Sequence, residues 1–134
     1  MKKFLVLNGA NLNMLGIREP VIYGKNTYKD LIKMLKSYAK ARKIKIVFCQ
    51  SNHEGTLIDE IQRAYFRNFD GIVFNPGGYT HTSVSLADAI KAVQIPTAEV
   101  HISDVSVRED FRKISYIRPV CAVTIAGQGF AGYT

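Results

Sequence analysis

Short apolar runs alternate with amphipathic stretches along the whole chain, and this alternation limits the possible folds more than any other feature. Five apolar runs are predicted to be buried strands, and they cover residues 3–7, 44–49, 71–74, 96–100 and 120–126. The stretches between them are predicted to be helices, and they cover residues 27–42, 57–67, 83–93 and 107–113. Strands joined by helices imply right-handed crossovers and a parallel sheet with helices on both faces. The sequence therefore predicts an α/β fold, a flavodoxin-like three-layer sandwich whose five-stranded parallel sheet has the order 2-1-3-4-5.

The first predicted helix begins with a capping box, Thr27 and Asp30, and carries a row of lysines along one face. The row comprises Lys29, Lys33, Lys36, Lys40 and Lys43. Apolar side chains occupy the opposite face, which is typical of a helix that packs on a core and exposes its charges to water. A polyanionic partner is the alternative explanation for the net charge of +7.

Composition is that of one globular domain. Of the 134 residues, 47% are hydrophobic and 22% are charged, which argues against disorder. No apolar run approaches the ~18 residues that a membrane span requires. The two cysteines lie far apart in separate apolar runs, so a disulfide framework is not expected. We expect a single domain over residues 1–134, soluble and cytoplasmic, without a membrane partner.

Polar residues follow four of the predicted strands, at the edge where open α/β sheets bind ligands. These segments cover residues 8–11, 50–53, 75–82 and 101–103, and they contain all three histidines of the chain. Ordinary turn chemistry explains any one such loop. Four loops together favour a ligand site at this edge.

Glu99 and His101 are the most informative pair in these segments. Residues two apart on a strand point to the same side, so the carboxylate can hydrogen-bond the imidazole. An oriented histidine at a strand end is suited to general acid or base catalysis, although a surface pair without chemistry is the alternative. The Ser103 hydroxyl and the amides of Ile102 and Ser103 are candidates for binding a carboxylate or a phosphate.

Residues 16–24 form a glycine-bounded loop that contains Arg18 and Tyr23 and is suited to act as a lid. The arginine can bind an anion, or it can lower the pKa of the phenol from its usual ~10. Composition alone favours the simpler interpretation, a solvent-facing arginine and a packing tyrosine.

Three other patterns carry less weight. The run from Gly127 to Gly132 matches the dinucleotide-binding pattern G-x-G-x-x-G, but no helix and no acidic residue follow it, so we interpret these glycines as a tight turn or close packing. The histidines lack the spacing of metal ligands, and no zinc site is expected. A second capping box, Ser106 with Glu109, is predicted to start the short helix at 107–113.

Six ordered blocks of sequence resemble the signatures of type II 3-dehydroquinate dehydratase. They are Asn8-Gly-Ala-Asn-Leu-Asn-Met-Leu-Gly16, Arg18-Glu-Pro20 with Tyr23-Gly24, Gln50-Ser-Asn-His-Glu-Gly55, Asn75-Pro-Gly-Gly-Tyr-Thr-His-Thr-Ser83, Glu99-Val-His-Ile-Ser103 and Arg108-Glu-Asp-Phe-Arg112. The resemblance covers nearly the whole chain. It implies the flavodoxin-like fold and a cofactor-free dehydration of 3-dehydroquinate to 3-dehydroshikimate through an enolate.

The same resemblance implies roles for individual residues. Tyr23 matches the base and Arg18 the residue that keeps this phenol acidic. His101 matches the general acid, which Glu99 orients, and Asn11 matches the residue that holds a water against the enolate oxygen. The remaining matches are substrate-binding groups: Asn75, Ile102 and Ser103 around the substrate carboxylate and a nearby hydroxyl, and His81, Arg112 and Asp88 at the ring hydroxyls. In the family, the residue that matches Asp88 reaches in from a neighbouring subunit. This implies a trimer and a dodecamer of four trimers.

The chain departs from the family pattern in a few places. The first turn has Ala10 where the family usually has proline, and Asp104 and Ser106 replace a common asparagine and histidine. The sequence also stops at Thr134, where members commonly continue into a helix. Two other functions fit the residues less well: a binding module for a phosphorylated ligand, which needs no Arg18 and Tyr23, and a nucleic-acid-binding domain, which needs only the lysines.

Overall fold

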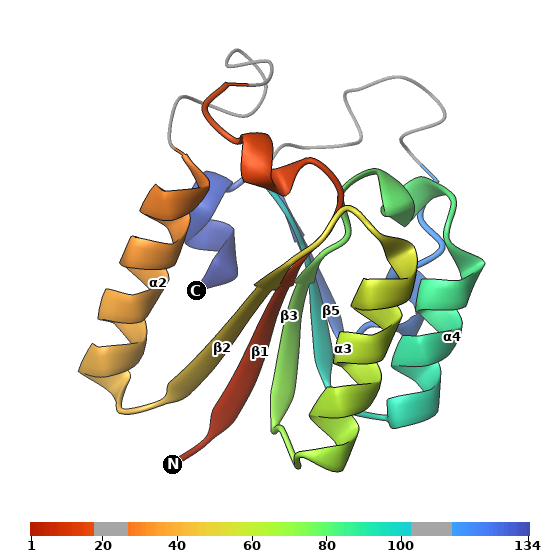
Figure 1. Cartoon of the computed structure of the whole chain (residues 1–134), viewed down its shortest axis with the longest axis horizontal. Coiled ribbons are helices and arrows are strands. Elements are labelled where there is room, and N and C mark those ends of the chain that lie inside the picture. Colours follow the sequence, from red (N-terminus) through yellow and green to blue (C-terminus); the bar gives the residue numbers. More distant parts are fainter. Residues whose placement is uncertain (18–26, 103–113) are drawn as a thin grey trace.

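A five-stranded parallel sheet with the order β2-β1-β3-β4-β5 forms the centre of the molecule (Figure 1). This computed structural model describes residues 1–17, 27–102 and 114–134. The strands are β1 (Lys3–Asn8), β2 (Lys45–Gln50), β3 (Gly71–Asn75), β4 (Thr97–His101) and β5 (Val123–Ala126). The helices are α2 (Tyr28–Arg42), α3 (Glu54–Phe66) and α4 (Val84–Val93), with short 3-10 turns η1 (Leu12–Met14), η2 (Gly77–His81), η5 (Arg118–Val120) and η6 (Gly129–Tyr133). The predicted fold class and strand order are confirmed.

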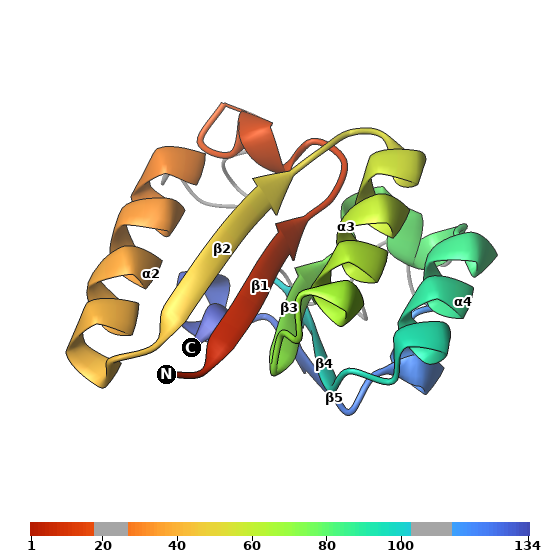
Figure 2. The ribbon, with the colours of Figure 1, turned by 60° about the horizontal axis from the view of Figure 1, so that its bottom comes forward.

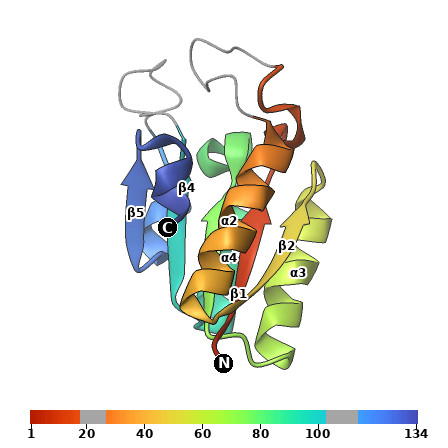
Figure 3. The same cartoon turned by 90° about the vertical axis from the view of Figure 1, so that its left-hand side faces the viewer.

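Helices cover both faces of the sheet and bury two separate apolar clusters. Helices α3 and α4 lie side by side on one face, where their apolar side chains pack against Leu5, Leu7 and Phe74 (Figure 2). Helix α2 and the C-terminal turn η6 cover the other face and enclose Val6 and Val100 (Figure 3). Successive residues of one strand therefore pack on opposite faces of the sheet, as the two-residue period of a strand requires.

Two element boundaries differ from the prediction by three residues, and the other described boundaries agree to within one residue. Strand β5 begins at Val123 instead of residue 120, because Arg118–Val120 form a 3-10 turn whose Pro119 has no N–H to give to a ladder. Helix α3 begins at Glu54 instead of residue 57, because Glu54, Gly55 and Thr56 are not buried and so show no apolar period before Leu57. The predicted helix at 107–113 and its Ser106 capping box lie outside the described residues.

The start of α2 matches the sequence prediction in detail. The Thr27 hydroxyl accepts a hydrogen bond from the Asp30 amide at 3.2 Å, and the Asp30 carboxylate accepts one from the Thr27 amide at 2.9 Å. The helix buries Leu31, Leu35 and Ala39. The predicted lysine row is exposed: Lys29, Lys33, Lys36, Lys40 and Lys43. The lysines therefore lie on the exposed face of this helix, as predicted.

The loops after β1 and β3 touch each other through their backbones. The Gly9 amide donates to the Asn75 carbonyl at 2.7 Å, and a Cβ at Gly9 would lie 2.2 Å from the Pro76 carbonyl oxygen. Gly77 has a φ of +63°, and a Cβ there would lie 2.6 Å from the Ala10 carbonyl oxygen. Both glycines are therefore required for the close approach of the two loops.

The dinucleotide-like run at the end of the chain is a turn and a packing segment. Gly127 has a φ of +76°, and a Cβ at Gly132 would contact Ile125 and Val100 at 3.4 Å. The interpretation of these glycines as turn and packing residues is confirmed. Both cysteines, Cys49 and Cys121, are free thiols. Among the described helices, none is long and apolar enough to cross a bilayer.

Candidate active site

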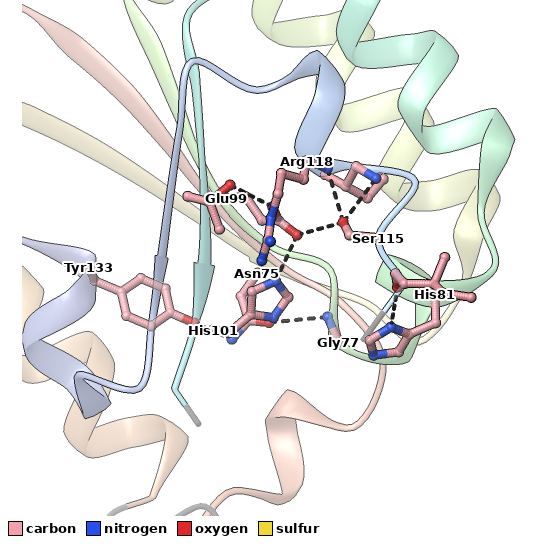
Figure 4. Close-up of polar contacts among 11 residues, drawn as sticks. Asn75, Gly77, His81, Glu99, His101, Ser115, Arg118 and Tyr133 are labelled. Atoms are coloured by element: carbon pink, nitrogen blue, oxygen red, sulfur yellow. Dashed lines mark hydrogen bonds and ion pairs between the residues drawn. The ribbon is translucent and has the colours of Figure 1, made fainter. Parts of the chain in front are cut away.

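Buried polar side chains meet at the carboxyl ends of the three central strands. Asn8 ends β1, Asn75 ends β3 and His101 ends β4, and Asn8 lies directly beside Asn75 in the parallel register. Their exposed fractions are 0%, 4% and 6%. Polar groups this deeply buried need hydrogen-bond partners. Asn75 bonds to the distant Tyr133 and to the nearby Gly77, and His101 bonds to Glu99 on the same strand (Figure 4).

The Glu99 carboxylate is completely buried and accepts three hydrogen bonds. Its Oε2 accepts from His101 Nε2 at 2.7 Å and from the Ser115 hydroxyl at 3.0 Å, and its Oε1 accepts from the Thr124 hydroxyl at 2.9 Å. The half-exposed Arg118 places its Nε 3.8 Å from Oε1. The hydrogen bond expected between Glu99 and His101 is therefore present. The hydroxyls of Ser115 and Thr124, which also hold the carboxylate, were not expected from the sequence.

These contacts keep the carboxylate ionised. Burial alone would raise the pKa of Glu99, but the hydrogen bond and charge of His101 and the hydroxyls of Thr124 and Ser115 together outweigh burial and hold this pKa below its ordinary value. An ionised carboxylate can only accept, so the hydrogen bond requires His101 Nε2 to carry a proton. Nδ1 is then the ring atom that this pair leaves for exchanging a proton with a ligand.

The Asn75 carboxamide is held at both of its ends. Its Oδ1 accepts from the Gly77 amide at 3.1 Å, and its Nδ2 donates to the Tyr133 hydroxyl at 3.0 Å. The tyrosine hydroxyl in turn donates to Asn8 Oδ1 at 2.6 Å. Burial raises the pKa of Tyr133 above its ordinary value, so this phenol stays protonated.

His81 lies in η2, immediately after β3, and is half-buried. Its Nδ1 is 2.7 Å from the Ile114 carbonyl oxygen. A carbonyl oxygen can only accept, so Nδ1 carries the proton, and Nε2 of the neutral ring is a hydrogen-bond acceptor. Such a nitrogen is suited to binding a hydroxyl group.

Asn11 is exposed in the loop after β1 and adopts a left-handed backbone with a φ of 69°. Its amide donates to Asn52 Oδ1 at 2.9 Å, and Gln50 Nε2 donates to the same oxygen at 3.2 Å. The Tyr79 hydroxyl donates to the Asn52 carbonyl at 2.7 Å. Asn52 therefore ties together the loops after β1, β2 and β3.

Other predicted site residues lie elsewhere or outside the described part of the chain. Asp88 is exposed on α4, and the structure gives it no contact with the described groups above. Ile102 follows β4 and buries its side chain in the α2-side cluster. The positions of Arg18, Tyr23, Ser103 and Arg112, and of the departures Asp104 and Ser106, are not described. Within the described residues, no three His, Cys, Asp or Glu side chains gather as metal ligands.

Sequence reasoning gave no individual role to four residues that support the site: Asn52, Ser115, Thr124 and Tyr133. Of these, Asn52 lies in the predicted polar segment 50–53. The contact of Thr124 could have been predicted in part. A strand order of 2-1-3-4-5 makes β5 the neighbour of β4, and Thr124 lies opposite Glu99 in that pair. Tyr133 offered a weaker signal, because a buried tyrosine hydroxyl normally needs a partner. Ser115 and Asn52 lie in irregular segments, whose contacts no periodic pattern predicts.

Comparison with known proteins matches almost the whole chain to one family. The family model described as "Dehydroquinase class II" matches residues 2–134. The chain is 53% identical to a 3-dehydroquinate dehydratase of Caldicellulosiruptor bescii over 99% of its own length and 92% of the relative's. It is 55% identical to a 3-dehydroquinate dehydratase of Fusobacterium nucleatum, over 98% of its own length and 90% of the relative's.

Solved structures give the same result. A type II dehydroquinase from Butyrivibrio crossotus superposes with a TM-score of 0.97 at 53% identity, covering 98% of this chain and 92% of that one. A type II dehydroquinase from Propionibacterium acnes gives a TM-score of 0.95 at 38% identity, with coverages of 99% and 91%. This chain belongs to the class II dehydroquinase family.

Proposed function

We propose that this chain is a 3-dehydroquinate dehydratase, a hydro-lyase that reversibly removes water from 3-dehydroquinate to give 3-dehydroshikimate. The observation that carries the proposal is the buried, braced pair formed by Glu99 and His101 at the carboxyl end of β4. It lies in a chain that matches the family over residues 2–134. Asn75, which ends the adjacent strand β3, and His81, which follows that strand, supply an amide and an imidazole suited to a polyhydroxylated acid.

The reaction begins at the carbon next to the ketone. Tyr23, as its phenolate, removes a proton from this carbon, and the electron pair of the broken C–H bond moves into the enolate. The cation of Arg18 favours the phenolate form of the base. Asn11 holds a water that hydrogen-bonds the developing enolate oxygen.

The second half of the reaction expels the hydroxyl. As the enolate collapses, its electrons form the new carbon–carbon double bond, and the carbon–oxygen bond breaks. His101 donates its Nδ1 proton to the departing oxygen, which leaves as water. Glu99 is a positioning residue in this step, because its bond to Nε2 fixes the ring and directs Nδ1 away from the carboxylate.

The remaining residues bind substrate. Asn75, Ile102 and Ser103 hold the carboxylate and the hydroxyl near it, and His81 and Arg112 bind ring hydroxyls. Asp88 of a neighbouring subunit completes the site, which agrees with its exposed position on α4. The minimal active unit is then a trimer, and four trimers form a dodecamer.

In the cell, the reaction belongs to the shikimate pathway, which leads to chorismate and the aromatic amino acids. Residues 1–134 act as one catalytic domain in the cytoplasm, on a small-molecule substrate, without cofactor, nucleic acid or membrane.

Absorbance of the conjugated enone tests the proposed function. The wild-type protein should generate this absorbance from 3-dehydroquinate, at a rate proportional to protein concentration. Tyr23→Phe should retain less than about a tenth of the turnover, since a general base contributes typically 10²–10⁴-fold. Tyr38→Phe is a matched control, because Tyr38 lies on α2 and its hydroxyl bonds only loosely, at 3.4 Å, to the Thr134 carbonyl. Absence of enone with folded wild-type protein would refute the proposal.

A further inference from the structure

Tyr133 connects the C-terminal end of the chain to the predicted substrate site. Its side chain is 6% exposed and lies in the cluster between α2 and the sheet, although its hydroxyl reaches the strand ends. There it makes two hydrogen bonds, to Asn8 at 2.6 Å and from Asn75 at 3.0 Å. Figure 4 shows the ring entering from the side of the sheet opposite to Ser115 and Arg118.

The direction of these hydrogen bonds fixes the orientation of the Asn75 amide. A hydroxyl has one hydrogen, and Tyr133 donates it to Asn8 Oδ1. Toward Asn75 the same oxygen can only accept, so the Nδ2 end of Asn75 must face it. The Gly77 amide, 3.1 Å from Asn75 Oδ1, requires the same orientation. The flipped amide would lose both contacts.

Asn8 completes this arrangement. It precedes the first loop, sits beside Asn75 in the sheet register and is fully buried. Its Oδ1 is committed to Tyr133, and its Nδ2 faces the Tyr28 hydroxyl at 3.5 Å. A phenylalanine at position 133 would fill the same apolar space, but it would leave two buried amides each lacking one partner.

We propose that Tyr133 is a positioning residue of the active site, whose hydroxyl holds the Asn75 carboxamide in the one orientation that presents its second Nδ2 hydrogen to the substrate. The proposal rests on the proposed function, because it takes Asn75 as a substrate-binding group. Tyr133 itself acts through Asn75.

The first test is Tyr133→Phe, assayed with 3-dehydroquinate. We expect KM to rise by about 5- to 10-fold, the equivalent of one net hydrogen bond, and kcat to change by less than KM. Tyr38→Phe removes a different hydroxyl that contacts the same C-terminal turn, and it should leave both constants unchanged. Equal constants for Tyr133→Phe and wild type would overturn the proposal.

A double-mutant cycle with Asn75→Ala separates positioning from general destabilisation. If Tyr133 acts through Asn75, adding Tyr133→Phe to Asn75→Ala should change kcat/KM by less than about twofold. The same loss in both backgrounds would mean that Tyr133 acts independently of Asn75, and the proposal would be wrong.

Denaturant unfolding of the same four proteins gives a readout that needs no substrate. Tyr133→Phe should lower the unfolding midpoint more in the wild-type background than in Asn75→Ala. If this coupling is present but wild type does not turn over 3-dehydroquinate, the proposed function fails and the hydrogen bond stands. If turnover is normal and the coupling is absent, the function stands and this inference fails.

A second variant covers the case in which Tyr133→Phe does not fold. Asn8→Ser removes the acceptor that directs the Tyr133 hydrogen, so the hydroxyl is free to turn toward Asn75. We expect KM to rise in the same direction. An unchanged KM in folded Asn8→Ser would contradict the orienting role of the hydroxyl.

Discussion

Glu99 is the residue whose environment is most demanding, because it keeps a negative charge in a fully buried position. Three hydrogen bonds from His101, Ser115 and Thr124 stabilise the charged form. A buried carboxylate without such partners would instead become protonated. The ionised Glu99 carboxylate has no proton to donate, and it orients the His101 ring by accepting the hydrogen bond from Nε2.

Acid should destabilise the protein through this residue. The pKa of Glu99 in the folded chain lies below the ordinary value of 4.5, so the unfolded chain binds the proton more tightly. The stability that Glu99 contributes is complete above pH 4.5 and is lost as the pH falls through the folded pKa. Urea unfolding from pH 6 to pH 3 should show this decline, and Glu99→Gln should flatten it. An equally steep decline in Glu99→Gln would assign the acid sensitivity to other groups.

Thr124→Val tests the brace on the carboxylate, because it removes the hydroxyl and keeps the shape of the side chain. We expect a loss of about 1–3 kcal/mol in unfolding free energy at pH 7, the usual contribution of a hydrogen bond to a charged group. Thr56→Val, at an exposed position of α3, is the matched control and should stay within about 0.5 kcal/mol. Similar values for the two variants would mean that the Thr124 hydroxyl does not stabilise Glu99.

Sequence patterns predicted the contact between Glu99 and His101 because residues two positions apart on a strand point to the same face. This holds for any strand, whichever strands lie beside it. The patterns did not predict Ser115 or Tyr133, whose partners lie 16 and 58 residues away along the chain. Those contacts depend on how loops and the C-terminal turn fold back on the sheet. Local periodicity carries no information about that path.

At the level of elements, apolar periodicity predicted every described helix and strand. The errors lie at element ends: three residues that are not buried, Glu54 to Thr56, precede the apolar period of α3, and a proline turn delays the start of β5. The loops that form the site depend instead on glycines at closely packed positions, and Gly9 is the clearest example.

Gly9→Ala should be strongly destabilising, since its Cβ would lie 2.2 Å from a backbone oxygen of Pro76 and neither loop can move without disturbing the strands. We expect a loss of more than about 2 kcal/mol in unfolding free energy, together with lower turnover. Gly78→Ala, with no atom within 4 Å of the added Cβ, is the control and should be close to neutral. Thermal unfolding compares the stabilities of the two variants. Equal melting temperatures for Gly9→Ala and Gly78→Ala would contradict the packing argument.

At the level of the whole molecule, the strand order explains why the site forms where it does. The order β2-β1-β3-β4-β5 places β1, β3 and β4 next to one another, so Asn8, Asn75 and His101 end at one edge although they are far apart in sequence. The sequence predicted this order and this edge. A role for Asp88 is predicted only through the family resemblance, because the proposed role involves a second subunit.

Subunit mixing tests the shared site. Light scattering should give three or twelve times the chain mass of 15.0 kDa, and we expect twelve. Asp88→Ala and Tyr23→Phe should each be nearly inactive, but mixed oligomers should recover part of the activity, because some sites then combine an intact Tyr23 with an intact Asp88. A fully active monomer, or mixtures with no recovered activity, would contradict a site shared between subunits.

The central claim is that His101, braced by Glu99, delivers the proton to the leaving hydroxyl and takes no part in removing the first proton. Its most direct test is the ratio of two rates in His101→Ala, measured in deuterated solvent: enone formation, and exchange of the substrate proton next to the ketone. We predict that dehydration falls by about 10²-fold or more, the usual contribution of a general acid, and that exchange falls far less. An equal loss of both rates would contradict the claim and would place His101 in substrate binding or enolate formation.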